Sequence, residues 1–159
     1  MTATSRSRLP ASITRAVNCA CWEPGARPSS KTEFQLGGLF DNRNGRLETA
    51  SNDLVLNASG FQNQDGSLLH LGNGTLGIST ANVLGAGGSL VTRGNLTLTA
   101  DEWTNSSVIQ AGKLTLNIGT LNQLAGAQLL ASNSLLGTGG NWSNDGLIAS
   151  DGSASLNLT

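Results

Sequence analysis

The stretch that decides the fold spans residues 40–78 and contains one plan twice: FDNRNGRLETASNDLVLNASG at 40–60, then FQNQDGSLLHLGNGTLGI at 61–78. Each copy opens with a phenylalanine, places an asparagine two positions later and a glycine five positions later, and ends in a strand-like alternation of apolar and other residues. Similarity at a fixed period of about 20 residues is typical of solenoid proteins. Further copies of this plan should therefore follow along the chain.

Six repeats account for the chain from residue 40 onward. They cover residues 40–60, 61–82, 83–102, 103–120, 121–141 and 142–159. Their opening residues are Phe40, Phe61, Val83, Trp103, Leu121 and Trp142. A first short strand is marked by Leu47, Leu68, Leu90, Ile109, Leu129 and Ile148. A second strand alternates at Leu54/Leu56, Leu76/Ile78, Leu96/Leu98, Leu114/Leu116 and Leu156/Leu158. Repeat 5 is the exception, because its Leu135 is followed by Gly137.

The alternation predicts strands with one side chain pointing inward and the next outward. One repeat alone cannot hide its inward Leu and Ile residues, whereas stacked repeats form continuous apolar columns about 4.8 Å apart along the axis. An asparagine follows the opening residue by two places at Asn42, Asn63, Asn105 and Asn144, where stacked amides can form hydrogen-bonded ladders. The sequence therefore predicts an all-β parallel β-helix of about six coils of roughly 20 residues, preceded by an irregular N-terminal segment.

Composition separates the chain into two parts. Residues 1–34 carry five basic and two acidic side chains, together with Cys19, Cys21 and all three prolines, whereas the remainder has a net charge of −4. We expect residues 1–36 to be disordered or foreign to the rod, and residues 37–159 to form a repeat β-helix truncated at its C-terminal end. No export signal is visible.

The overall charge of −1 offers no general attraction to nucleic acid. No run approaches the roughly 20 apolar residues of a membrane span. We therefore expect neither nucleic-acid binding nor a membrane span.

The repeats at 40–60, 61–79 and 142–159 resemble the haemagglutinin repeats of filamentous haemagglutinin-like exoproteins, a family that includes two-partner-secreted adhesins and the stalks of contact-dependent growth-inhibition toxins. The aromatic-x-Asn opening, the Gly-x-apolar step and the Leu-Thr-Leu strand carry this resemblance. It implies a right-handed parallel β-helix, export through an outer-membrane transporter to the surface of a Gram-negative bacterium, and contact with a receptor or glycan of a host or neighbouring cell.

Several residues are candidates for chemistry, but we assign no catalytic, cofactor-binding or metal-binding residue. The acidic side chains scatter over turns, and only Asp101 and Glu102 are adjacent. His70, the one histidine, lacks ligands at metal-binding spacing, so we expect a surface position. Trp103 and Trp142 share the column of Phe40 and Phe61, which favours packing over ligand binding. The stretch 84–88 is expected to be a glycine-rich turn, and Cys19 and Cys21 to be incidental thiols.

The favoured function is a non-enzymatic stalk or adhesive segment of a secreted exoprotein. A β-helical carbohydrate-active enzyme is the alternative, for which at least two outward carboxylates and a Lys or Arg should gather on neighbouring coils. A third hypothesis is a degenerate fragment with no independent function. Because open strand edges pair readily, we also expect end-to-end self-association.

Overall fold

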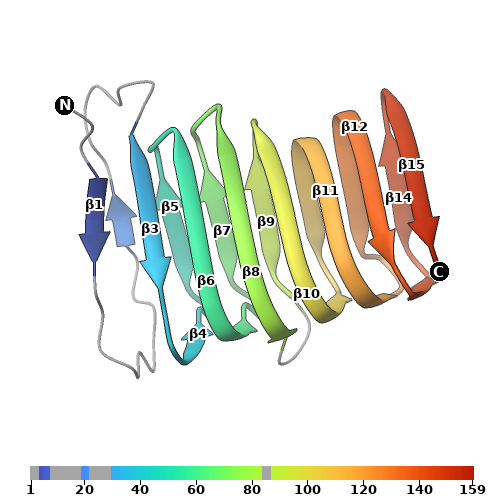
Figure 1. The fold of residues 1–159 in the computed structure, drawn as a ribbon, viewed down its shortest axis with the longest axis horizontal. Helices are drawn as coiled ribbons and strands as arrows, with labels where there is room; N and C mark the ends of the chain where they lie inside the picture. The colour runs from blue at the N-terminus through green and yellow to red at the C-terminus, as the bar shows by residue number, and fades with distance from the viewer. Residues whose placement is uncertain (1–3, 8–18, 22–29, 84–86) are drawn as a thin grey trace.

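The computed structural model describes residues 4–7, 19–21, 30–83 and 87–159, and these residues form strands and turns with no helix. The strands are β1 (Thr4–Ser7), β2 (Cys19–Cys21), β3 (Lys31–Gln35), β4 (Leu39–Asp41), β5 (Arg46–Thr49), β6 (Asp53–Gln62), β7 (Ser67–His70), β8 (Thr75–Val83), β9 (Ser89–Thr92), β10 (Asn95–Asn105), β11 (Val108–Gln123), β12 (Gln128–Gly139), β13 (Asn141–Asn144), β14 (Leu147–Ser150) and β15 (Ser153–Leu158). All the pairings among them are parallel, and the chain winds into a β-solenoid of about six turns (Figure 1). The predicted fold class is confirmed.

Each turn has three faces, which we name by the columns that they bury. Face A stacks the opening residues of the repeats, as in the pairs Phe40↔Phe61 and Leu121↔Trp142. Face B stacks the first-strand residues, from Leu47↔Leu68 onward. Face C stacks the alternating strands. The three columns expected from the repeat plan are therefore the three inner walls of the solenoid. Repeat 6 departs from the plan on face C: Leu156 and Leu158 pair with Gly137 and Gly139, one inward position further along than expected, and Ala154 pairs with Leu135.

Face C shows how the chain keeps its columns in register although the repeats differ in length. Leu54 pairs with Leu76, and Leu96 pairs with Leu114, so the first pair is separated by a longer stretch of chain than the second. Because the strands stay aligned, the length differences are taken up elsewhere in each turn.

One apolar core runs along the axis. It contains the inward residues of faces A, B and C from Phe34 to Leu135, and those at the centre are at most 1% exposed, as at Leu56, Leu98 and Leu116. Phe61 stacks on Phe40 and on Trp103, with ring centroids 5.4 and 5.5 Å apart respectively. Each such buried side chain contributes about 1.5–3 kcal/mol, so stacking is the main source of stability.

The backbone conformation of the turns between faces A and B explains why Asn or Asp precedes the repeat glycine. Asn44 and Asp65 precede Gly45 and Gly66, and both have a positive φ of 55°. Asn and Asp tolerate this left-handed conformation better than other residues with a Cβ. In repeat 5 the same need is met by Gly126, at φ 83°.

The solenoid begins earlier than the expected boundary between residues 36 and 37. Strand β3 pairs with β6, and Phe34 on β3 is buried in the core. The backbone of β1 pairs with β3 and that of β2 with β5. The expectation of disorder for residues 1–36 therefore does not hold for β3, and residues 1–3, 8–18 and 22–29 lie outside the described part.

The glycine exception in repeat 5 has a steric cause. A Cβ at Gly137 would overlap the indole ring of Trp142 and the side chain of Leu156, and one at Gly139 would overlap the carbonyl of Ile118. The Trp142 ring thus occupies the space that a large inward residue fills in the other repeats, and its Nε1 donates to the Ile118 carbonyl at 2.9 Å.

The last strands, β13, β14 and β15, form what we call the terminal coil, at the end of the solenoid opposite β1 (Figure 1). Its side chains are far less buried than their equivalents in the central repeats. Leu156 and Leu158, expected to be inward, are 48% and 43% exposed. They continue the columns of Leu116 and Ile118, which are each 1% exposed. The columns continue to the terminal coil, but their burial does not.

Candidate functional site

His70 is buried, and the expectation of a surface position is wrong. It lies on face B in the inward column Thr49–His70–Thr92, and it is 0% exposed. Its Nδ1 lies 2.9 Å from Thr92 Oγ1, and its Nε2 lies 3.0 Å from the Ser51 carbonyl oxygen. The carbonyl can only accept, so Nε2 carries the proton and Nδ1 accepts from Thr92. The sequence of repeat 2 alone did not indicate that His70 is buried in a polar column. The threonines that complete this column, Thr49 and Thr92, belong to the repeats on either side.

Burial lowers the pKa of His70, because the charged imidazolium loses its hydration inside the solenoid; hydrogen bonds to the backbone at Ser51 and Asn52 and the charge of Asp53 oppose this shift. The imidazole is therefore neutral at pH 7, and both nitrogens are occupied. It links three successive repeats as a structural brace.

The asparagines of face A form part of the predicted ladder. Asn42 Nδ2 donates to Asn63 Oδ1 at 2.7 Å, and Asn105 Nδ2 donates to Gln123 Oε1 at 2.9 Å. Gln123 Nε2 then donates to the Leu147 carbonyl at 2.7 Å. These side chains are at most 1% exposed, so the amides replace water for one another inside a corner of the solenoid. Gln123 takes the place of an asparagine, which the spacing alone did not indicate.

The carboxylates pair locally. Asp41 accepts two hydrogen bonds from the Arg43 guanidinium, and Glu48 accepts two from Arg46. The contact with Asp41 raises the pKa of Arg43. Asp41 is only 4% exposed.

The other acids lie apart from these pairs. Asp53 Oδ1 accepts from the Thr75 backbone N–H at 2.7 Å. Asp101 and Glu102 are both exposed on β10. Within residues 30–83 and 87–159, no group of three or more Asp, Glu, His or Cys side chains could hold a metal ion.

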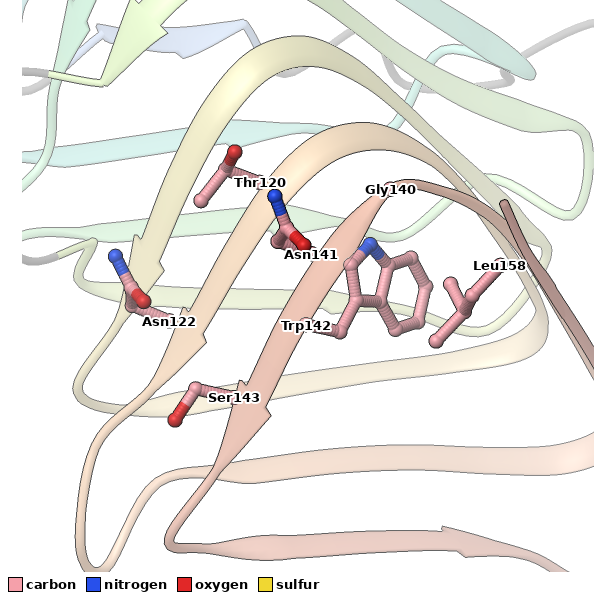
Figure 2. Close-up of a pocket in the computed structure, with 7 residues that line it drawn as sticks. All are labelled: Thr120, Asn122, Gly140, Asn141, Trp142, Ser143 and Leu158. Atoms are coloured by element: carbon pink, nitrogen blue, oxygen red, sulfur yellow. The ribbon is translucent and has the colours of Figure 1, made fainter.

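The two tryptophans differ in their surroundings. Trp103 is 1% exposed and packs on Phe61, as expected from its column. Trp142 is only partly buried, and it lies beside a hollow of about 340 Å³ in the terminal coil. The hollow is lined by Thr120, Asn122, Gly140, Asn141, Trp142, Ser143 and Leu158 (Figure 2).

This hollow lies beside β13 and the paired end of β11, and it was not predicted. Asn141 and Ser143 lie on the outer side of β13, whereas Trp142 lies between this strand and Leu158 (Figure 2). The sequence signal that could have indicated it is the pairing of Gly137 and Gly139 with a tryptophan in the next repeat. Chemically, the hollow offers apolar contact, amide and hydroxyl groups, and the backbone of an edge strand.

Two sequence candidates are only partly described. In the glycine-rich stretch, residues 84–86 lie outside the described part, while Gly87 packs near Trp103. Cys19 and Cys21 pair through their backbone with Leu47 and Thr49, and their side chains lie outside the description.

Taken together, the fold and these contacts define a parallel β-solenoid protein whose buried polar side chains His70, Asn42, Asn63, Asn105 and Gln123 bind to groups of neighbouring repeats. No protein-family model, curated protein or solved structure matches the chain. Among the described residues, none forms a helix with the length and hydropathy needed to cross a membrane.

Proposed function

We propose that the chain is a structural and adhesive stalk segment, of the kind found in secreted filamentous haemagglutinin-like adhesins and contact-dependent inhibition toxins. In this role the solenoid is non-catalytic. Its parent protein reaches the bacterial surface through an outer-membrane transporter, and the side of the rod meets a receptor or glycan of another cell.

The unbroken core carries this proposal. The inward columns of faces A, B and C pass through successive repeats as one cluster, and β11 crosses from face B through face C to face A without interruption. A solenoid in which each repeat packs only on its neighbours is an extended scaffold that holds its two ends apart. That is the mechanical requirement of a stalk.

The outer side of face C supports an adhesive role. Its two central outward columns contain no charged residue from β6 to β15. They consist of Val55, Gly77, Thr97, Thr115, Leu136 and Ser155, and of Asn57, Ser79, Thr99, Asn117, Thr138 and Asn157. Hydroxyl and amide groups at the strand spacing of about 4.8 Å suit contact with a neutral, hydroxyl-rich surface such as a glycan.

A cell-binding assay tests the adhesive part. The labelled chain is added to epithelial cells and to unrelated bacteria, and bound protein is measured with and without glycosidase treatment of the cells. We expect saturable binding that Thr97→Glu combined with Thr115→Glu reduces at least tenfold. Gln110→Glu, on the outer side of face B, is the matched control and should leave binding unchanged. Equal binding by all variants, or none by the parent chain, contradicts adhesion through face C.

The genomic DNA around the coding region tests the stalk part. Repeats of the same plan in the flanking sequence, with a gene for an outer-membrane transporter close by, are expected for an exoprotein of this kind. Flanking DNA with neither feature contradicts the assignment to a secreted stalk.

A further inference from the structure

The outer side of face C carries a long, narrow surface of uncharged side chains, which we call the neutral strip. Its first column runs from Val55 to Ser155 and its second from Asn57 to Asn157, on strands β6, β8, β10, β11, β12 and β15, which lie side by side in this order (Figure 1). With a strand spacing of about 4.8 Å the strip is about 24 Å long, whereas its two columns are only about 7 Å apart.

Charged side chains mark the borders of the neutral strip. Asp53 on β6 and Lys113 on β11 lie two residues before the first column. Asp101 on β10 lies two residues after the second column and is exposed. At β3, Glu33 occupies the register position next to Val55 and ends the strip. The long direction of the uncharged surface therefore crosses the strands and follows the axis of the solenoid.

The second column contains only hydroxyl and amide side chains. Its members Ser79, Thr99 and Asn117 are exposed. Among the described residues, the only hydrogen bond that the side chains of this column form is donated by Thr138 Oγ1 to Asn117 Oδ1, at 3.0 Å. Most of the donors and acceptors of the column are therefore free to bind a ligand.

The first column is more apolar. It includes Val55 and Leu136, of which Leu136 is 39% exposed, and the methyl groups of Thr97 and Thr115. A sugar ring presents C–H groups on its faces and hydroxyl groups on its edges. One column can thus contact the C–H groups of a sugar chain while the other binds its hydroxyl groups.

Shape and charge restrict the kind of glycan that fits the neutral strip. A linear chain laid along the strip contacts successive coils, whereas the tip of a branched glycan reaches only one or two of them. An acidic polysaccharide would lose hydration of its charged groups without gaining an opposite charge in either column. An uncharged chain carries no such cost.

We propose that the neutral strip binds a linear, uncharged polysaccharide whose chain runs along the solenoid axis, across the strands. This inference rests on the adhesive role proposed above and specifies the ligand of that role. Each further sugar unit reaches groups on another coil, so the affinity rises with the length of the bound chain although each single contact is weak.

A length series of purified oligosaccharides tests the proposal without cells. The chain is titrated calorimetrically with cellulose, xylan and linear mannan oligomers, from disaccharide to hexasaccharide. In at least one series the dissociation constant should fall at least tenfold with length. A hyaluronan hexasaccharide, which is linear but acidic, is the control and should bind at least tenfold more weakly than the best neutral hexasaccharide. The absence of binding in all three neutral series, or binding that does not depend on length or charge, overturns the proposal.

Two variants test the direction of the bound chain. Thr115→Glu divides the neutral strip near its middle and should weaken binding of the hexasaccharide at least tenfold, whereas Asn57→Glu, at its β3 end, should weaken it only about threefold. Gln110→Glu on the outer side of face B should change nothing, and circular dichroism checks that all three variants remain folded. If the sugar chain lies along a strand instead, each coil is a separate site and both strip variants have the same small effect. That result overturns the lengthwise arrangement.

The outcome can be separated from that of the cell-binding assay. Binding to cells through face C without binding to any neutral oligomer contradicts this inference and leaves the adhesive role standing. Length-dependent binding to an oligomer without binding to cells supports this inference and contradicts the adhesive role.

Discussion

The central repeats and the terminal coil follow the same sequence plan but differ in what that plan achieves. Leu116 and Leu156 belong to one inward column, yet one is 1% exposed and the other 48%. The difference is the presence of a following coil. A repeat therefore supplies one side of an interface, and the stability of the solenoid resides in the contacts between repeats.

The largest effect expected from this comparison comes from shortening a leucine side chain in the column that contains Leu116 and Leu156. Leu116→Ala should lower the free energy of unfolding by about 2–5 kcal/mol, because it leaves a cavity between two coils. Leu156→Ala is the matched change and should cost about 1 kcal/mol or less, because half of the side chain is already in water. Urea denaturation of both variants measures the difference. Equal losses in the two variants would falsify the view that the burial of a leucine, and not its place in the column, determines its contribution to the free energy of unfolding.

The amide column gives a second, smaller contrast. Asn105→Ala should cost about 2 kcal/mol, because it leaves the buried Gln123 Oε1 without its donor. Asn144→Ala, in the exposed terminal coil, should cost about 0.5 kcal/mol. The same denaturation assay applies, and a larger loss for Asn144→Ala would mean that the ladder is most important at its end.

Overpacking at the border between the two regions should have a somewhat smaller effect. Gly137→Ala places a methyl group against Trp142 and should cost about 1–2 kcal/mol. Gly77→Ala is the control: a Cβ there meets nothing closer than 3.9 Å, and stability should change by less than about 0.5 kcal/mol. Quenching of Trp142 fluorescence by iodide should increase only in the first variant. If quenching is unchanged, the ring is not displaced.

The last expected effect is the pH dependence of stability due to His70. Its pKa is lowered in the folded chain, so between that value and the ordinary 6.5 the unfolded chain binds a proton that the folded chain does not. Stability should therefore be complete above pH 6.5 and should fall by up to about 1.4 kcal/mol per unit below it. Thermal melts from pH 7.5 to 5 should show this slope in the parent chain and a shallower one in His70→Gln. Parallel slopes would assign the effect to carboxylates.

The sequence was sufficient to predict the structural features that recur in every repeat. Inward positions such as Leu54 and Leu76 follow from alternation alone, and the strand register confirms them. Features that depend on two repeats at once were harder to see. His70 is buried because Thr92 and Ser51 supply its hydrogen bonds from adjacent coils, and the space above Gly137 is filled from the following repeat. A single-repeat pattern contains no information about such exchanges of volume or hydrogen bonds.

The exchange between Gly137, Gly139 and Trp142 has a consequence for how such a chain can change in evolution. A recombination event that deletes or moves repeat 6 alone removes the indole and leaves Gly137 facing an empty space. Moving repeat 5 alone gives its glycines a new neighbour without the tryptophan. The heritable module at this point is thus a pair of repeats, and chains assembled by duplication should retain or lose the two together.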